Sequence, residues 1–460
     1  MTQSTAEVVI CGAGIAGIAA AYHLTVRRGV KTVILVDQLP PLSLTSDKSS
    51  ECYRNWWPGP GDAMVGLMNR SIDILEELAH ESDNMFHLNR RGYLFATANP
   101  SRIADFTRAA KESAELGAGS VRYHTGQPGE PAYVPAPPRG FVDLPTGADI
   151  ILDQPLIRKH FPCLSERTVA VLHARRCGWF SAHQCGMYML EQARAHGATL
   201  LQARVERIEV AGGRVKAVRL SATDGSFTIS TPTFVNAAGP YIQQVGGMLG
   251  VDLPVYWELH SKVVFNDHLG VVPRDAPLII WTDAQYLPWS EEEKALLAGP
   301  RETNWLLGEF PVGVHGRPEG GQDSTMVMLV WTYDTEPVEP VFPLRFDPRH
   351  PEIVLRGMST MIPGLRPYFD RIPKCVVDGG YYTKTRENRP LVGPLPVQGA
   401  YLIGALSGFG MMASSAAGEL LAAYITGSSL PPYAPAFRLE RYQDPEYQKL
   451  LEAWGESGQL

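Results

Sequence analysis

A glycine-rich turn near the start of the chain has the spacing of a nucleotide-binding loop. The apolar run 8–11 leads directly into the sequence GAGIAG, which a helical pattern follows. In such a turn the first glycine makes the bend, the second lets the backbone approach a pyrophosphate, and the third allows close helix–strand packing. These positions are Gly12, Gly14 and Gly17. The N-terminus of the following helix would direct free N–H groups at phosphate oxygens.

An acidic residue downstream completes this pattern. A second apolar run, 33–36, ends on Asp37, twenty residues past Gly17. At that distance a carboxylate accepts hydrogen bonds from ribose hydroxyls and disfavours a 2′-phosphate. The sequence therefore predicts a dinucleotide site for NAD or FAD rather than NADP.

The elements that would position this site lie at both ends of the chain. A short apolar strand ends in NAAGP at 236–240, and a strand at 401–403 precedes a glycine turn and a helix over 411–425. Between them, residues 255–377 show the alternation of antiparallel strands. We therefore expect an α/β fold in which a Rossmann-like domain is assembled from discontinuous segments and carries an inserted α+β domain on a mainly antiparallel sheet.

Composition narrows the classes of protein. A net charge of −7 and a pI near 6.0 give no basic surface for nucleic acid. No run of 18 apolar residues occurs, so we expect no membrane span. The first residues lack the basic segment of a secretory signal. Six scattered cysteines without metal-ligand spacing predict reduced thiols, a cytoplasmic location and no metal site.

Three segments, in order, resemble the D-amino-acid-oxidase/sarcosine-oxidase superfamily of FAD-dependent oxidoreductases. They are GAGIAG with Asp37, NAAGP at 236–240, and GAYLIGALSGFGMMAS at 399–414. The resemblance covers nearly the whole chain and implies FAD as cofactor. It places an FAD-binding domain at 1–85, 150–254 and 376–430, a substrate domain at 86–149 and 255–375, and a C-terminal tail at 431–460.

The later segments add candidates for cofactor binding. In the family's arrangement, Gly408 and Gly410 would turn a second helix N-terminus towards the flavin N1/C2=O, where negative charge develops on reduction. A tight strand-to-helix connection would explain the same two glycines. Val205 and Gly239 are further candidate contacts, although Gly239 is also typical of close packing.

The resemblance also assigns residues near the substrate. In the family a serine-rich loop, here 44–57, covers the pyrophosphate and the flavin ring, and Ser46 and Ser50 match its hydroxyls. Arg54 matches an arginine that binds the substrate carboxylate, a role that suits a permanently charged, bidentate guanidinium. A structural ion pair is the alternative for this arginine. Tyr382 is the tyrosine that would face the substrate.

Two other sets compete for active-site roles. Glu258, His260 and Lys262 share one face of a strand at period two. His260 could accept a proton and Lys262 could promote the reaction of reduced flavin with oxygen, but a solvated strand face fits the pattern too. Arg317 lies in a turn that resembles the family's xRP turn near the substrate cavity; it could bind a carboxylate or be structural.

The chain departs from the family at two positions. Gly380 stands where some members carry the cysteine that binds FAD covalently, so we expect noncovalent FAD. Met412, which we keep among the cofactor-binding candidates, replaces a lysine that holds flavin and carboxylate in the sarcosine-oxidase branch. Loss of that charge favours a larger, more apolar amine or amino acid over sarcosine or glycine.

These features predict an FAD-dependent enzyme that oxidises the C–N bond of an amino acid or secondary amine. Hydride would pass to flavin N5, water would hydrolyse the resulting imine, and O2 or another acceptor would reoxidise the flavin. A 2-hydroxy-acid or polyol dehydrogenase on the same scaffold is one alternative. A flavin-bound assembly protein without turnover is the other.

Overall fold

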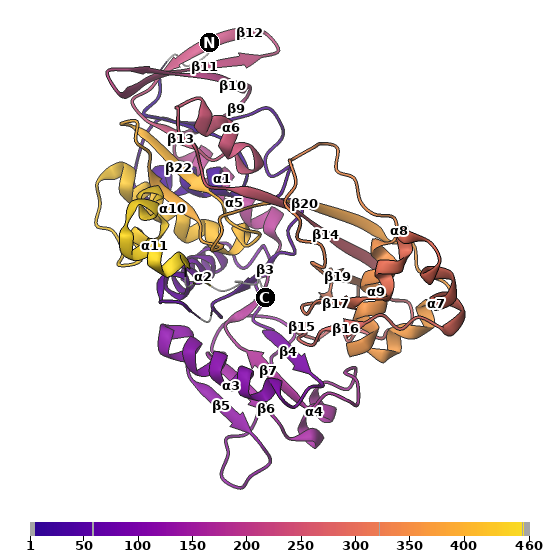
Figure 1. Cartoon of the computed structure of the whole chain (residues 1–460). Coiled ribbons are helices and arrows are strands. Elements are labelled where there is room, and N and C mark those ends of the chain that lie inside the picture. Colours follow the sequence, from indigo (N-terminus) through magenta and orange to yellow (C-terminus); the bar gives the residue numbers. More distant parts are fainter. Residues whose placement is uncertain (1–4, 58, 322, 453, 455–460) are drawn as a thin grey trace.

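The computed structural model describes residues 5–57, 59–321, 323–452 and 454 (Figure 1). A six-stranded sheet has the order β21–β22–β13–β1–β2–β9, in which all strands are parallel except β21. Its alternate residues face two different cores, as expected for a buried sheet. The strands are β1 (Val8–Cys11), β2 (Val33–Asp37), β9 (Ala198–Gln202), β13 (Phe234–Asn236), β21 (Leu391–Pro394) and β22 (Ala400–Gly404).

Different layers cover the two faces of this sheet. Four helices share the core on one face: α1 (Ile15–Tyr22), α2 (Ala63–Glu81), α5 (Ala182–Ala195) and α10 (Gly410–Thr426). On the other face lie α6 (Ile242–Gly247) and a three-stranded sheet formed by β10 (Arg204–Ala211), β11 (Arg214–Ala222) and β12 (Gly225–Ser230). The layered arrangement and the large antiparallel sheet described below confirm the expected α/β fold class.

The second sheet has nine strands in the order β20–β14–β19–β18–β15–β4–β7–β6–β5. Its pairs are antiparallel except β15–β4 and β5–β6. Its strands are β4 (Tyr93–Thr97), β5 (Val121–His124), β6 (Ala148–Ile151), β7 (Ala170–Ala174), β14 (Tyr256–Asn266), β15 (Leu278–Trp281), β18 (His315–Pro318), β19 (Met326–Val330) and β20 (Val376–Lys384).

Strand pairing divides the chain differently from the ranges expected from the sequence. β6, β7 and β20 pair into the nine-stranded sheet, although most of their residues fall within 150–254 or 376–430. The reason is that these strands pair with strands that are distant in the sequence: Ala96 of β4 opposes Val171, and Glu258 of β14 opposes Tyr382. By pairing, the chain passes from the six-stranded to the nine-stranded sheet after β2 and after β13, and it returns after β7 and after β20.

Smaller elements complete the molecule. The ribbon of β3 (Cys52–Arg54) and β8 (Cys177–Trp179) shares a core with α3 (Arg102–Ser113) on one face of the nine-stranded sheet. Helices on the opposite core include α4 (Gln154–His160) and α9 (His350–Met361). The remaining elements are α7 (Glu291–Ala298), α8 (Arg301–Asn304), α11 (Pro445–Glu452), β16 (Gln285–Tyr286) and β17 (Glu309–Phe310).

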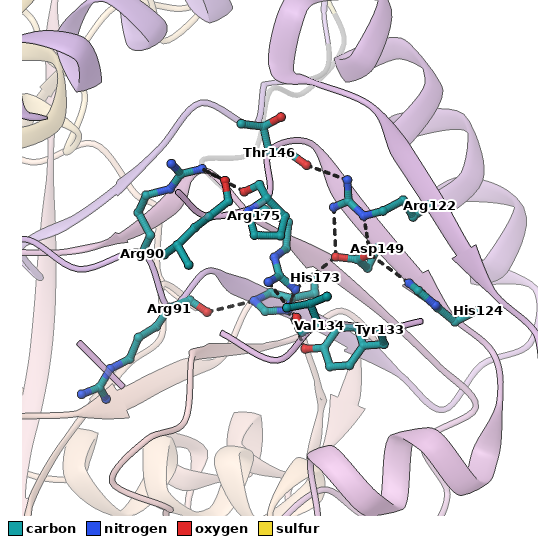
Figure 2. Close-up of polar contacts among 12 residues, drawn as sticks. Arg90, Arg91, Arg122, His124, Tyr133, Val134, Thr146, Asp149, His173 and Arg175 are labelled. Atoms are coloured by element: carbon teal, nitrogen blue, oxygen red, sulfur yellow. Dashed lines mark hydrogen bonds and ion pairs between the residues drawn. The ribbon is translucent and has the colours of Figure 1, made fainter. Parts of the chain in front are cut away.

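The irregular loop 125–147 is held against the sheet by arginines (Figure 2). Asp149 of β6 accepts hydrogen bonds from Arg122 at 2.7 Å, His124 at 2.9 Å and Arg175 at 3.1 Å. The guanidinium groups also donate to loop carbonyls: Arg122 to Thr146, Arg175 to Val134, Arg90 to Pro145 and Arg91 to Pro138. Arginine suits this task because its five N–H donors serve a carboxylate and carbonyls together.

The described part of the C-terminal tail packs onto the loop that joins β20 and β21. Arg441 is buried and donates to Glu387 at 2.7 Å, and Tyr442 and Tyr447 donate to the same carboxylate oxygen. The tail therefore forms part of the folded body. Within the described residues, every helix is too short or too polar to cross a bilayer.

Candidate functional site

The glycine turn after β1 is fixed by close backbone contacts. Gly12 has a φ of +114°, and a Cβ there would lie 2.3 Å from the carbonyl oxygen of Ala237. A Cβ on Gly17 would lie 2.0 Å from the carbonyl oxygen of Gly12. No other residue type fits these positions without moving the backbone. The turn therefore brings the N-terminus of α1 up to β13, as a dinucleotide-binding turn requires.

Asp37 and Ser46 shape the entrance to α1. Asp37 ends β2, and its two carboxylate oxygens accept hydrogen bonds from the N–H groups of Ala13 at 2.8 Å and Leu39 at 2.9 Å. The hydroxyl of Ser46 accepts one from the N–H of Ile15 at 3.0 Å. Both side chains thus lie where the orphan N–H groups of the helix begin.

A cavity of about 310 Å³ opens beside this turn. Its lining includes five of the sequence-predicted cofactor residues: Gly12, Gly14, Asp37, Ser46 and Val205. A sixth, Gly239, belongs to the lining as well. Sequence reasoning missed three further lining residues, namely Arg204 of β10, Tyr241, and Gln244 of α6. A carboxylate near the glycine turn and an open helix N-terminus suit the ADP half of a dinucleotide.

A narrower cavity of about 100 Å³ shares part of this lining and reaches the second glycine turn. Gly14, Ser46 and Gly239 line both cavities. The narrower cavity is also lined by Tyr382 and by both predicted glycines, Gly408 and Gly410, at the N-terminus of α10. Two helix N-termini therefore face one continuous lining, and their positive ends suit an electron-rich, anionic group.

Three predicted cofactor residues lie outside both linings. Gly17 acts in the packing of α1, as described above. In the other two cases the neighbouring residue lines the narrower cavity: Ser49 in place of Ser50, and Met411 in place of Met412. Met412, like Met411, belongs to the core shared by the four helices.

The remaining candidates share one face of the nine-stranded sheet. Paired residues of neighbouring strands point to the same face, as do residues two apart along one strand. Lys262 of β14 pairs with Val330 of β19, which pairs with His315 of β18. Glu258 pairs with Tyr382 of β20. This face therefore carries Glu258, His260, Lys262, His315, Arg317 and Tyr382.

A buried chain of polar groups surrounds His260. Lys384 donates to both oxygens of Glu258 at 2.9 Å, and His260 Nε2 lies 2.8 Å from Glu258 Oε2. Burial alone would raise the pKa of Glu258, but the hydrogen bonds from His260 and Lys384 outweigh burial and lower it. The His260 ring stacks on Tyr382 with 3.9 Å between centroids. Burial raises the pKa of Tyr382 to about 12, so its phenol stays neutral.

Lys262 and Arg317 hold the loop that follows β2. Lys262 donates to the carbonyl oxygen of Ser49 at 2.9 Å, and Arg317 donates to that of Ser50 at 2.8 Å. Arg317 also pairs with Glu51 and with Glu319, its Glu319 contact being 2.9 Å. These contacts anchor the loop that lines the narrower cavity, and they occupy the Arg317 guanidinium with protein groups.

Arg54 lies on the β3–β8 ribbon that packs over this face. Its side chain is 6% exposed, and its guanidinium carbon lies 4.4 Å from the centroid of Trp57, whose ring meets Phe409 edge-on. Burial lowers the pKa of Arg54, yet arginine keeps its charge in proteins. Arg54 lines a third cavity of about 610 Å³, with Phe95, Ile280 and other apolar side chains.

His315 shares this strand face, and sequence reasoning did not single it out. Its Nδ1 lies 2.8 Å from the carbonyl oxygen of Gly313, which requires the proton on Nδ1 and leaves Nε2 as an acceptor. Burial and the charge of Arg54 lower its pKa to about 4. Among the described residues, no side chain or backbone group makes a hydrogen bond to Nε2. The only available signal was its position two residues before Arg317, on the same strand face.

Comparisons with known proteins agree with this geometry. Human mitochondrial dimethylglycine dehydrogenase is 23% identical over 330 residues, which are 68% of this chain and 33% of that protein. The chain thus spans about a third of the length of the curated relatives it matches. The solved structure of L-proline dehydrogenase from P. horikoshii superposes with a TM-score of 0.73 at 18% identity, covering 96% of this chain and 98% of that one.

Glycine oxidase from Geobacillus kaustophilus superposes with a TM-score of 0.71 at 15% identity, covering 95% of this chain and 99% of that chain. At these low sequence identities, the structural similarity shows that the fold is shared and no more. The family described as "DAO: FAD dependent oxidoreductase" matches residues 7–424, nearly the whole chain, and confirms the resemblance inferred from three short segments. The chain belongs to the DAO family of FAD-dependent oxidoreductases.

Proposed function

We propose that this protein oxidises the C–N bond of an amino acid or secondary amine, with noncovalent FAD and with O2 or another molecule as electron acceptor. The observation that carries the proposal is the lining shared by two cavities, which joins the glycine turn after β1 to the second glycine turn at α10 in a chain of the DAO family. Arg54 is a buried cation, and its charge contributes to the lowered pKa of His315. The similar proteins named above carry names of enzymes for glycine, L-proline and dimethylglycine.

An amino acid presents a carboxylate and an amine on one carbon. Arg54 offers the donors that a carboxylate accepts, in a water-poor setting where such hydrogen bonds are strong. His315 Nε2 offers a lone pair that accepts a hydrogen bond from an amine N–H. Together they would fix the orientation of the α-carbon between them. Tyr382 adds a neutral hydroxyl-bearing ring at the lining of the narrower cavity.

The residues present fit FAD. The Gly12 and Gly17 contacts leave no room for side chains at the phosphate turn, and Asp37 and Val205 line the cavity suited to the ADP half. Gly408 and Gly410 line the extension suited to the flavin. When bound there, FAD supplies the two-electron oxidising chemistry. The protein contributes binding, orientation and exclusion of water.

Noncovalent attachment is supported by the surroundings of two residues. A Cβ on Gly380 would already lie 3.2 Å from the Cα of Thr45, so a cysteine side chain has little room at this position. Cys375 packs against the core that contains α9, on the opposite side of the sheet from Tyr382. A purified protein whose flavin remains in the supernatant after acid precipitation would support noncovalent binding; flavin in the pellet would contradict it.

Anaerobic reduction of the bound flavin tests the reaction class. We expect amines or amino acids to bleach the flavin absorbance, and 2-hydroxy acids and polyols not to. Bleaching by hydroxy acids or polyols alone would replace the proposal with the dehydrogenase alternative. If no compound of either class bleaches a flavin that dithionite still reduces, a non-catalytic flavoprotein is the better description. Reoxidation in air, compared with reoxidation by an artificial acceptor, then separates oxidase from dehydrogenase.

A further inference from the structure

The cavity beside Arg54 contains a second buried arginine. Arg389, in the loop between β20 and β21, is 4% exposed and donates to the carbonyl oxygen of Pro60 at 2.7 Å. Its guanidinium carbon lies 4.7 Å from the ring centroid of Trp454 and 5.9 Å from that of Tyr447. Arg389, Trp454 and Arg54 all line the same cavity of about 610 Å³.

Arg389 lacks a counter-ion within the part of the chain that the structure describes. No carboxylate there lies within 4.0 Å of its guanidinium, and its Nε has no hydrogen-bond partner. A buried charge is costly unless it is paired, and two aromatic faces and one carbonyl supply only part of that pairing. An anion in the cavity would supply the rest.

The other charged groups of the cavity are already matched or lie at its rim. Arg102 pairs with Asp105 at 3.4 Å. Glu387 shares the wall but is buried against Arg441, whose guanidinium donates to it at 2.7 Å. Glu112 is solvent-exposed. Within the described lining, Arg389 is therefore the buried charge that lacks a counter-ion.

Much of the remaining cavity lining is apolar. The cavity wall is formed by residues of α2, α3 and the strand face that carries Ile280, namely Met64, Phe95, Phe106, Leu172 and Ile280, together with Trp57. Such a wall accommodates a short hydrocarbon spacer and offers it no hydrogen bonds. A single small amino acid such as glycine would leave most of the cavity unfilled.

We propose that the substrate is dianionic: an amine that carries, besides the carboxylate at Arg54, a second carboxylate that Arg389 binds. This inference rests on the proposed function, since Arg54 is assigned to the first carboxylate there. It keeps the larger size expected from the sequence but departs from the expected apolar character, because the added group carries a charge. Arg389 acts here as a specificity-determining residue with no part in the bond-breaking step.

Isosteric substrate pairs test this inference. Glutamate is compared with glutamine, and iminodiacetate with its monoamide, by anaerobic flavin reduction with the FAD-loaded protein. Because each pair differs only in the second charge, we expect the dianionic member to react with at least tenfold higher kcat/KM. In Arg389→Met this ratio should collapse towards one while the flavin spectrum is retained, and Arg389→Lys should recover part of it.

A matched arginine on the same cavity provides the control. Arg102→Met should change the ratio less than threefold, because Arg102 already pairs with Asp105 and is partly exposed. Preference of the unmodified protein for the neutral members, or an equal loss for both members in Arg389→Met, would overturn the inference while leaving amine oxidation intact. Failure of every amine and amino acid to reduce the flavin would instead overturn the proposed function.

Discussion

Two buried histidines of the nine-stranded sheet, His173 and His315, differ in whether the acceptor nitrogen of the ring receives a hydrogen bond. His173 on β7 lies 2.9 Å from the carbonyl oxygen of Arg91 through Nε2, and its Nδ1 accepts from Tyr133 and Arg175 (Figure 2). His315 on β18 donates through Nδ1 to Gly313, and no group among the described residues makes a hydrogen bond to its Nε2. Both rings are neutral, with a pKa of about 3 for His173 and about 4 for His315.

The difference separates a structural cluster from a reactive one. Around His173 the acceptor nitrogen is filled by protein donors, and the result is a loop fixed against the sheet edge. Around His315 the acceptor nitrogen receives no protein donor among the described residues, and the charge of Arg54 contributes to the lowered pKa of the ring. The imidazole of His173 is thus used up by the fold, whereas His315 keeps an acceptor to which a ligand could donate.

The largest expected effect on catalysis comes from removing the positive charge of Arg54. Arg54→Met should lower kcat/KM for the preferred substrate about 100- to 1,000-fold, mainly through KM, because a buried carboxylate loses a charge-assisted partner. Steady-state kinetics checks this, and an unchanged flavin spectrum shows that the FAD site is intact. Arg54→Lys keeps the charge without the bidentate geometry, so its kcat/KM should lie between those of the unmodified protein and Arg54→Met. A KM like that of the unmodified protein would remove the carboxylate role.

Filling or deleting the acceptor nitrogen should have the next largest effect. His315→Leu should lower kcat/KM about 10- to 100-fold, the equivalent of one hydrogen bond to a charged or strongly polar group. Since the pKa of His315 is about 4, the imidazole is neutral throughout pH 6–9 and should add no limb to the kcat/KM profile there. A limb near pH 6.5 that disappears in His315→Leu would show that this imidazole is protonated in the resting enzyme.

Gly12 could be predicted from the sequence and His315 could not, because the first depends on the spacing of nearby residues and the second on the pairing of distant strands. The turn, Asp37 and Ser46 lie within 35 residues and follow from spacing, since each position has its own steric or hydrogen-bonding requirement. His315 reaches the site only because β18 pairs with β19 and β19 with β14. Register across three strands is not encoded in any short window of sequence.

The one-residue offsets at the cofactor linings have a related cause. Ser49 and Ser50 lie in an irregular loop, where no period of 2 or 3.6 determines which side chain faces inwards. Met411 and Met412 lie in the first turn of α10, where successive side chains point about 100° apart. Motif matching places such segments correctly, but only the backbone direction decides which neighbour lines the cavity.

The hydrogen-bonded cluster around His173 should affect the stability of the protein in acid and leave substrate oxidation unchanged. The unfolded chain protonates His173 below its ordinary pKa of 6.5, whereas the folded protein keeps it neutral to about pH 3. Stability therefore falls as pH drops through this window, by about 2 kcal/mol at pH 5 for this group. His173→Gln should lose part of that acid sensitivity, seen as a smaller fall in Tm between pH 7.5 and pH 5. An identical fall would mean that His173 is already protonated in the folded protein.

The smallest expected effect concerns the outermost arginine of the same cluster. Arg122 is about a quarter exposed, and without it Asp149 still accepts hydrogen bonds from His124 and Arg175. Arg122→Met should therefore cost about 1 kcal/mol or less, since partly exposed ion pairs contribute little. Thermal unfolding at pH 7.5 measures it. A loss as large as that of Arg175→Met, which removes a buried partner, would show that the carboxylate depends on all its donors together and that the cluster has no redundancy.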